Sequence, residues 1–469
     1  MKNVMLPSHI NGMGEYEFSL FKELMTALNY HATKNAVKEK YYEGKISLND
    51  VNLGIALPLG MSGLEIGCAW GAKTVDVLAA RSMFDGFVGS DGTNNDQLNR
   101  IVAGNRLITE YKKACRDELK LGCTFATLSA DPLIGCRIRF HSAQTATAFW
   151  DGEKGRVGCG LAIIDTAKDE SKVYIPSLIN MYTDDSIWVI RRDKNTWSAK
   201  QYSHKMGRPL IEPLIWNATS SKPLGRSRIK EPIRRLIDGY VRTIANATIG
   251  LEFSTAPQKY LLGVTDDQYD AIVDSKFQQY VGSIIASTVN PETGEKPSFG
   301  QLSQGSITPH VEMLRVLSTQ FSAATGLSVT DTGVVNDANP TSSDAILAQT
   351  QTLVATAEEL NAGNGDALKT IALMALAIAN NTTMENLSDD QLGIIAHFKN
   401  PAMPSIAATS DAAIKIASAR ENFAQTDTFL EMIGFDQADI RRIRAQEQRI
   451  RGIQILNEVA NEDNTENMG

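Results

Sequence analysis

Two stretches with helical spacing of apolar residues, separated by a compact insert, constrain the fold of this 469-residue chain more than any other feature. The first covers residues 229–251, and as a helix it would be about 35 Å long. In the second, Thr308 is a good N-cap, Pro309 suits the first turn, and Gly326 ends the helix. The insert at residues 253–307 has strand and turn signals, so the pattern predicts an antiparallel stalk that carries a small module at its tip. The apolar positions are Ile229, Ile233, Leu236, Ile237, Tyr240, Val241 and Ile244 in the first stretch, and Val311, Leu314, Leu317, Phe321 and Ala324 in the second.

The part of the chain before the stalk combines helices with an antiparallel sheet. Apolar spacing predicts a helix over residues 15–42, which Gly44 terminates, and two more over residues 72–83 and 105–120. From residue 123 to residue 214 the pattern changes to short alternating runs with Asp-Gly, Asp-Asp and Gly-rich turns between them, which is typical of antiparallel strands. Together with the stalk, these elements predict an α+β fold.

The part after the stalk is predicted to be helical, apart from one segment of turn-forming residues. Residues 327–340 have neither helical nor strand period. An Ala-rich helix is predicted over residues 342–380, with an interruption at the sequence NAGNG of residues 361–365. Two further helices are predicted over residues 411–433 and 437–458, with a glycine stop between them.

Composition and charge disfavour several classes of protein. Lys and Arg total 46 against 54 Asp and Glu, so the net charge is -8, and a protein that binds nucleic acid mainly through a basic surface normally has the opposite sign. The 5 cysteines include no CxxC pair and the 6 histidines no HxxxH or HExxH spacing, so we expect buried reduced thiols and no metal centre.

The apolar runs are far shorter than the roughly 20 residues that cross a bilayer, and the first residues lack the pattern of a signal peptide. We therefore expect a soluble protein, made inside a cell, without membrane contact.

Two overlapping glycine-containing strings are similar to cofactor-binding loops, and each departs from the pattern that it approaches. LEIGCAWG, residues 64–71, is similar to the loop of an S-adenosylmethionine methyltransferase, but Ala69 and Trp70 stand where glycine matters. GCAWGAKT, residues 67–74, nearly matches the phosphate-binding loop GxxxxGK[ST], but Ala72 replaces its second glycine. We favour an amphipathic helix that opens at Trp70, and we expect no catalytic residue, no cofactor and no enzymatic activity. A nucleotide- or S-adenosylmethionine-binding enzyme remains an alternative hypothesis.

Two basic clusters are candidate contact surfaces. The first surrounds the start of the first stalk helix, and the second decorates the last helix. The helix–glycine–helix pattern around Gly434 is also compatible with a DNA-binding regulator of the helix-turn-helix type. The alternatives are a solvated or subunit-contacting face, and phosphate contact without sequence recognition, for which Arg441, Arg442 and Arg444 are the candidates. The two clusters are Arg226, Arg228, Lys230, Arg234 and Arg235, and Arg441, Arg442, Arg444, Arg449 and Arg451.

A set of short strings, each occurring once, is distributed in order along most of the chain. They are YYEG at residues 41–44, WGAKTVDVLAARSMFDGF at 70–87, HKMGRPLIEPL at 204–214, GRSRI at 225–229, RRLIDGYVRT at 234–243, PQKYLLG at 257–263, ATGLS at 324–328 and NPTSSDAI at 339–346. In this order they resemble the portal proteins of tailed double-stranded DNA bacteriophages, of the long-tailed siphophage type. Lys259 departs from the Arg that relatives commonly carry, and residues 390–469 match most weakly.

The resemblance implies the phage portal fold, in which α+β subunits form a ring, normally a dodecamer, at one capsid vertex. It implies an α/β wing over residues 1–228 and two stem helices, 229–252 and 309–328, with a small α/β clip, 253–308, inserted between them. Residues 329–341 would be the tunnel loop, 342–388 the long helix that returns into the wing, and 389–469 the end of the wing and a helical crown. The stalk and tip that the helical spacing predicts agree with this organisation.

The resemblance also implies a function and a set of partners. Double-stranded DNA would pass through the ring, without sequence recognition, when the genome is packaged and again when it is ejected. The clip would dock the large subunit of terminase and later the head-tail adaptor, while the major capsid protein and a scaffolding protein would contact the rest of the ring. The protein would be made in the cytoplasm of the host bacterium and located in the virion.

The acidic balance suits such a channel. Residues 329–387 contain seven Asp and Glu against Lys369 alone, a net charge of -6, and strong neutralisation of phosphates would hold sliding DNA in place. A solvated helix face is the alternative interpretation of this charge. The tunnel loop implied by the resemblance would place Val334, Val335 and Asn336 nearest the DNA, and Asp331 and Asp337 would discourage tight phosphate binding. The candidate channel residues are Asp331, Thr332, Val334, Val335, Asn336, Asp337 and Asn339.

Overall fold

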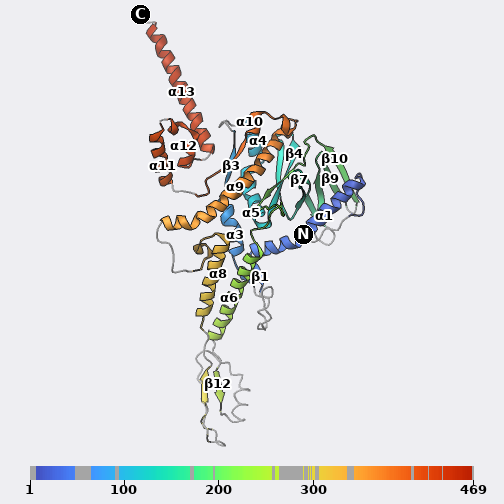
Figure 1. Ribbon diagram of the computed structural model, residues 1–469, viewed down its shortest axis with the longest axis vertical. Helices are drawn as coiled ribbons and strands as arrows, with labels where there is room; N and C mark the ends of the chain where they lie inside the picture. Colours follow the sequence, from blue (N-terminus) through green and yellow to red (C-terminus); the bar gives the residue numbers. More distant parts are fainter. Residues whose placement is uncertain are drawn as a thin grey trace. The chain divides into compact units, whose positions relative to one another are not determined.

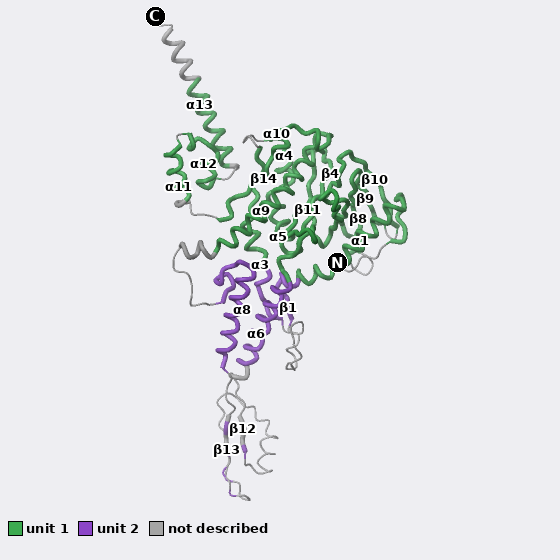
Figure 2. Tube along the Cα trace, in the orientation of Figure 1, with its two compact units in different colours: residues 1–39, 74–230, 342–469 green, residues 40–73, 231–341 purple. Residues whose placement is uncertain are grey.

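The computed structural model divides the chain into two compact units, which Figure 2 colours separately. Unit 1 comprises residues 1–39, 74–230 and 342–469, and unit 2 comprises residues 40–73 and 231–341. The structure describes residues 7–47, 65–89, 95–168, 174–193, 196–255, 259–262, 298–301, 306–334, 343–402, 406–420, 422–435 and 437–466, together with residues 289, 294 and 296.

The larger sheet of unit 1 is a five-stranded antiparallel meander in the order β10-β9-β8-β7-β6. Helix α1 (Glu15–Tyr42), which has the predicted bounds, covers one face of it (Figure 1). The helix buries Phe21, Leu24 and Met25 against Ile179 and Ile190 of the sheet, because apolar residues three and four apart share one helix face. The strands are β6 (Ala146–Asp151), β7 (Arg156–Lys168), β8 (Tyr174–Tyr182), β9 (Ser186–Asp193) and β10 (Thr196–Ser203).

A second, three-stranded antiparallel sheet of unit 1 has the order β11-β4-β5. Helices α5 and α9 both contact β4 and β5, so this sheet lies in the helical part of the unit. A separate two-stranded sheet pairs β14 with β3. The antiparallel region predicted over residues 123–214 is confirmed. The elements are β3 (Phe84–Val88), α4 (Asp96–Gly104), α5 (Leu107–Leu121), β4 (Cys123–Asp131), β5 (Gly135–Ser142), β11 (Ile211–Ile215), α9 (Ser343–Ala379) and β14 (Ile395–Phe398).

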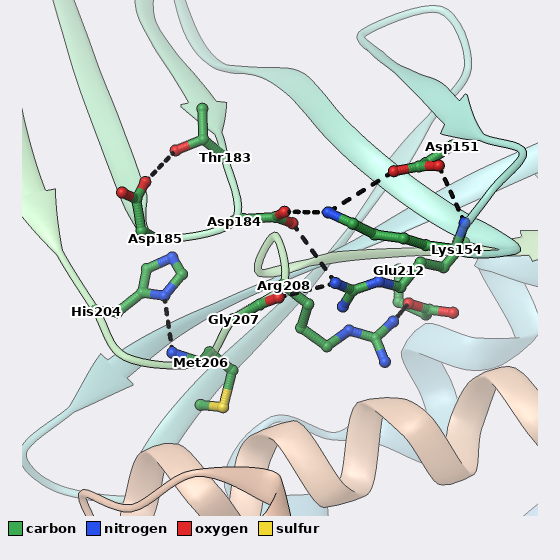
Figure 3. A network of polar contacts seen from close by, with 11 residues as sticks. Asp151, Lys154, Thr183, Asp184, Asp185, His204, Met206, Gly207, Arg208 and Glu212 are labelled. Atoms are coloured by element: carbon green, nitrogen blue, oxygen red, sulfur yellow. Dashed lines mark hydrogen bonds and ion pairs between the residues drawn. The ribbon is translucent and has the colours of Figure 1, made fainter.

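The string HKMGRPLIEPL contributes to a polar network at the strand ends of unit 1 (Figure 3). Arg156 donates from its Nη2 to the carbonyl oxygen of Gly207 at 2.8 Å, and Arg208 pairs with the carboxylate of Glu212 on β11. Burial raises the pKa of Glu212 to about 7, although Arg208 and Arg156 favour its charged form. This string therefore has a structural role, because its polar contacts connect strands of unit 1.

Helix α9 is continuous where the sequence predicts an interruption. Residues 361–365, with two glycines and two asparagines, lie inside it. The asparagine side chains point into unit 1, where the hydroxyl of Ser82 donates to Asn361 Oδ1 at 2.6 Å and Asn364 Nδ2 donates to the hydroxyl of Tyr111 at 2.9 Å. Tertiary hydrogen bonds therefore offset the poor helix propensity of this segment.

The same helix is shorter than the 342–388 segment that the resemblance implies. It ends at Ala379, and Asn381 follows with a φ of 50°, a left-handed conformation that a helix cannot continue through. A 3₁₀ turn, η2 (Met384–Asn386), and the short α10 (Asp389–Leu392) follow.

The C-terminal part of unit 1 contains three helices where two are predicted. The helix expected over residues 411–433 is broken, because the Thr426 hydroxyl accepts a hydrogen bond from the N–H of Phe429 at 3.3 Å and caps a new helix. Gly434 ends that helix with a φ of 109°, as predicted. The last helix extends beyond the expected residue 458. The elements are α11 (Ile406–Ala419), η3 (Phe423–Gln425), α12 (Asp427–Ile433) and α13 (Gln437–Glu466).

Unit 2 contains the two predicted stalk helices, α6 (Glu231–Thr255) and α8 (Thr308–Thr325), which lie side by side (Figure 1). Gly326 ends α8 in a left-handed conformation, but Thr308 is not its N-cap: Ile307 occupies that position without a side-chain cap. The other elements are β1 (Lys45–Ser47), β2 (Glu65–Gly67), α3 (Trp70–Ala79, which continues into unit 1), β12 (Lys259–Leu262), β13 (Ser298–Gln301) and η1 (Val329–Thr332). Strands β12 and β13 form an antiparallel pair, and most of the predicted clip lies outside the described residues.

No helix among the described residues is at once long enough and apolar enough to cross a membrane.

Candidate functional site

The α6–α8 pair is the framework of the candidate site in unit 2. Its contact is close at Gly239, where an added Cβ would come within 3.2 Å of the Leu317 side chain. Leu317 and Phe321 of the predicted α8 stripe are buried, whereas Val311 is 42% exposed and so lies outside the core. The pair is therefore held together near its junction with the rest of unit 2 rather than along the whole of α8.

Trp70, the first residue of α3, organises that junction. Its ring stacks on Phe321 of α8 with centroids 4.5 Å apart, and it lies 4.7 Å from the ring of Tyr240 on α6. Its indole Nε1 donates a hydrogen bond to the backbone oxygen of Thr332 at 3.0 Å. One buried side chain thus contacts both stalk helices and fixes the backbone that follows α8.

The first part of the predicted tunnel loop is ordered by these contacts, which corrects the expectation of a non-periodic segment. Ser328 and Asp331 form a capping box around η1, and the buried Thr332 hydroxyl lies 2.6 Å from the hydroxyl of Ser318 on α8. Asp331 and Thr332 therefore belong to the junction, and Gly333 ends the 3₁₀ turn with a φ of 75°. Val334 is half-buried. Four further candidate channel residues, Val335, Asn336, Asp337 and Asn339, lie outside the described residues.

The YYEG string packs against α6 and α3. The Tyr41 hydroxyl donates to Asp238 of α6 at 2.6 Å, and the Arg234 guanidinium lies 5.7 Å from the centre of the Tyr41 ring. Backbone approaches closely here too, because an added Cβ at Gly71 would lie 2.0 Å from the carbonyl oxygen of Tyr41. Strings far apart in the sequence therefore meet at one junction of unit 2, to which residues 41–44, 70–73, 234–243 and 324–328 contribute.

The first basic cluster is divided between the two units. Arg226, Arg228 and Lys230 precede α6 and belong to unit 1. The expectation that Arg228 lies on a surface is wrong: it is 9% exposed, and its Nε donates to the carbonyl oxygen of Thr74 at 2.5 Å. Burial lowers the pKa of Arg228 to about 10. Arg228 therefore has a structural position, whereas Arg226 and Lys230 are exposed.

The remaining two residues of that cluster lie on α6. Arg235 is exposed and pairs with Glu231 one turn earlier at 3.3 Å, while Arg234 is half-buried beside Tyr41. An exposed pair of this kind contributes less than about 1 kcal/mol to stability, so Arg235 is free to serve a contact surface.

The second basic cluster is partly occupied by the chain's own carboxylates. Arg444 lies 2.7 Å from Asp427 and 2.8 Å from Glu447, and these hydrogen bonds raise its pKa above the ordinary value. A phosphate would have to compete with both carboxylates at Arg444. Arg442 is exposed, and Arg441 lines a cavity of about 510 Å³ between α12, α13 and the end of β14.

The glycine-containing segment at residues 67–74 forms no phosphate cradle. Strand β2, which precedes it, has three residues and pairs antiparallel with β1, and α3 begins at Trp70 as predicted. The described residues contain no group of three or more His, Cys, Asp and Glu that could hold a metal ion. The thiols of Cys68, Cys115, Cys123 and Cys136 are buried, as expected, and burial raises the pKa of Cys68 to about 11.

Comparisons with known proteins give a match to one protein family and similarities to solved structures. The protein family described as phage portal protein, SPP1 Gp6-like, matches residues 23–452. A chain from the virion of a native gene transfer agent particle is 12% identical with a TM-score of 0.43, and the similarity covers 75% of this chain and 86% of that chain. A chain from the neck of the native particle computed with C12 symmetry is also 12% identical with a TM-score of 0.43, over 78% of this chain and 89% of that chain. A search of curated proteins finds no match.

Proposed function

Because the chain belongs to the SPP1 Gp6-like family of phage portal proteins, we propose that it forms a ring, normally of twelve subunits, at one vertex of a capsid. The observation that carries the proposal is the family match over residues 23–452, which includes the α6–α8 pair and the Trp70 junction. In this role the ring connects the head to the tail and serves as the channel for double-stranded DNA. Neither catalysis nor a cofactor is part of the proposal.

The Trp70 junction supports a specific position for the tunnel loop. Residues 335–341 follow η1, which Trp70 and Ser318 hold against α8, and they precede α9. We propose that this segment and the preceding Val334 face the DNA, with Val334, Val335 and Asn336 nearest to it. Contacts there are weak and sequence-independent, since residues 329–387 have a net charge of -6 and repel phosphates.

We propose that the segment between the stalk helices, residues 253–308, binds the other protein assemblies that act at the capsid vertex. The large subunit of terminase binds there during packaging, and the head-tail adaptor replaces it afterwards. The major capsid protein and a scaffolding protein contact unit 1. These partners place the protein in the virion after synthesis in the cytoplasm of the host bacterium.

The mass of the purified protein in solution tests the ring. Light scattering coupled to size exclusion is expected to give a homogeneous assembly of about twelve chains, and negative-stain images are expected to show rings with a central hole. A monomer or dimer at all concentrations would contradict the proposal. Sequence-dependent DNA affinity of such a species would instead support a DNA-binding regulator, a function that the occupied Arg444 disfavours.

The tunnel-loop assignment predicts a variant that assembles but does not package. Replacing residues 335–341 with a Gly-Ser linker of equal length leaves Thr332 and the η1 capping box intact, so the ring is expected to form normally. DNA packaging or retention is expected to fall at least tenfold, measured as nuclease-protected DNA per particle. Full packaging by this variant would refute the assignment, and loss of the ring would show that the segment is needed for assembly instead.

A further inference from the structure

Charge is divided along α13, a 30-residue helix that is about 45 Å long. Its first half, residues 437–451, carries five arginines against Asp439 and Glu447, a net charge of +3. Its second half, residues 452–466, contains four carboxylic acids and no Lys or Arg, a net charge of -4. The acids of the second half are Glu458, Glu462, Asp463 and Glu466.

This division is unfavourable for an isolated helix. The helix dipole favours cations in the last turn, but the last turn of α13 has no basic residue and contains Asp463 and Glu466. In the first half, the chain's own carboxylates pair with Arg444 and, at 3.7 Å, with Arg442. The exposed Arg449 has no ion-pair partner among the described residues, and the same holds for Arg451. The charges of Arg449 and Arg451 are therefore available to another molecule.

An apolar strip runs along the same helix and is left uncovered where the two halves meet. Ile440 is buried, whereas Ile450 is 55% and Ile453 59% exposed. Spacings of three and seven residues place Ile440, Ile443, Ile450 and Ile453 on one face, which is the spacing of residues that pack between helices. The exposed part of the strip is flanked by the basic half on one side and the acidic half on the other.

We propose that α13 packs against α13 of a second copy of this chain, offset along its axis so that the acidic half of one helix lies beside the basic half of the other. The two exposed isoleucines lie within this contact. A helix that is basic at one end and acidic at the other is complementary to its own copies, and an offset contact of this kind is head-to-tail, which is the type of contact that builds a ring when the rotation between neighbouring copies closes. DNA is a poorer partner, because only the basic half would attract it and the acidic half would repel it.

The inference rests on the proposed ring and adds a specific interface to it. The family match ends at residue 452, so the acidic half of α13 lies beyond it.

Paired charge reversals test the interface. One variant, Arg449→Glu/Arg451→Glu, changes the net charge of the first half from +3 to -1, and another, Glu458→Arg/Glu462→Arg, changes that of the second half from -4 to 0. The combined four-residue variant restores opposite charges at the substituted positions, as does an equal mixture of the two double variants, because the reversed positions of one variant then meet the reversed positions of the other. Lys112→Glu/Lys113→Glu on the exposed side of α5 is the control with the same change in net charge as the first variant.

The readout is the mass distribution by light scattering across a dilution series at 50 mM and at 1 M salt, with circular dichroism to verify helix content. At 50 mM salt, each double variant is expected to need at least tenfold more protein for half-assembly than the unaltered chain. The four-residue variant, the mixture and the control are expected to stay within threefold of it. At 1 M salt the difference is expected to shrink, since the screening length falls to about 3 Å.

The possible outcomes separate this interface from the proposed ring. If the unaltered chain forms rings and the double variants assemble equally well, the interface is wrong and the ring stands. If the first variant fails and neither the mixture nor the four-residue variant recovers, charge pairing between copies is refuted. If the first variant assembles normally but loses affinity for double-stranded DNA, the basic half contacts phosphate instead. An unaltered chain that remains monomeric overturns both proposals, whereas a dimer that the reversals disrupt and the mixture restores supports the interface alone.

Discussion

Replacing Trp70 with alanine is expected to destabilise unit 2 by about 3–5 kcal/mol, the range for truncating a large buried aromatic side chain. The indole stacks on Phe321 and lies against Tyr240, so the truncation leaves a cavity between the two stalk helices. It also removes the donor that holds the carbonyl oxygen of Thr332. Hydrogen exchange is the appropriate measurement, and faster exchange is expected for the amides of η1 and of the last turns of α8.

Two further substitutions separate the packing of Trp70 from its hydrogen bond. Trp70→Phe keeps most of the aromatic contact but leaves the Thr332 carbonyl without its donor. This loss is expected to lower the stability of unit 2 by about 1–3 kcal/mol. Trp150→Ala in β6 is the matched control, because that indole is only partly buried, and the exchange of η1 is expected to be unaffected by it. Unchanged protection of η1 in Trp70→Ala would show that the capping box alone orders this turn.

The stalk was predictable from the sequence because the signals that define it are local. Apolar residues recur at helical spacing in α6 and α8, and Gly326 takes the left-handed conformation that ends a helix. The capping box at Ser328 and Asp331 has a local signal as well, a Ser followed three residues later by an acidic residue. That spacing would have predicted that residues 329–332 are ordered rather than part of an irregular loop.

Features that depend on distant partners were not predictable in this way. Residues 361–365 have low helix propensity, and nothing near them in the sequence indicates that Asn364 bonds Tyr111 and Glu118 on α5. An arginine is normally expected on the surface of a protein. Arg228 is instead held by a hydrogen bond to the carbonyl oxygen of Thr74, 154 residues away. A single sequence carries no record of such pairs, and both errors follow from applying local rules to tertiary contacts.

Glu118 is expected to make the stability of unit 1 depend on pH, with a loss of up to about 5 kcal/mol between its two pKa values. The side chain is fully buried on α5, where one carboxyl oxygen accepts a hydrogen bond from Asn364 Nδ2 at 2.9 Å. The other oxygen has no hydrogen-bond partner among the described residues. Burial raises the pKa of Glu118 from an ordinary 4.5 to about 8, so the folded chain keeps a proton that the unfolded chain releases. The stabilisation is therefore complete below pH 4.5 and is lost as the pH rises through 8.

Other groups titrate in the lower part of this interval. Burial raises the pKa of Glu212 to about 7, which adds a further loss of stability up to that pH. Burial lowers the pKa of His141 from 6.5 to about 4, so this group gains stability as the pH rises over that range. Above pH 9 the buried thiols begin to contribute, since burial raises the pKa of Cys68 from 9.0 to about 11. The interval from pH 7 to pH 8.5 therefore isolates Glu118 best.

Glu118→Gln tests this assignment, because glutamine has nearly the same shape and does not titrate. Between pH 7 and pH 8.5 the unaltered chain is expected to lose about 1 kcal/mol of unfolding free energy in urea, and the variant almost none. Glu110→Gln, at a partly exposed position on the same helix paired with Lys113, is expected to keep the slope of the unaltered chain. Equal slopes in all three proteins would mean that Glu118 is already ionised at pH 7. The α5–α9 contact would then contain a buried carboxylate, with Asn364 as a hydrogen-bond donor to it.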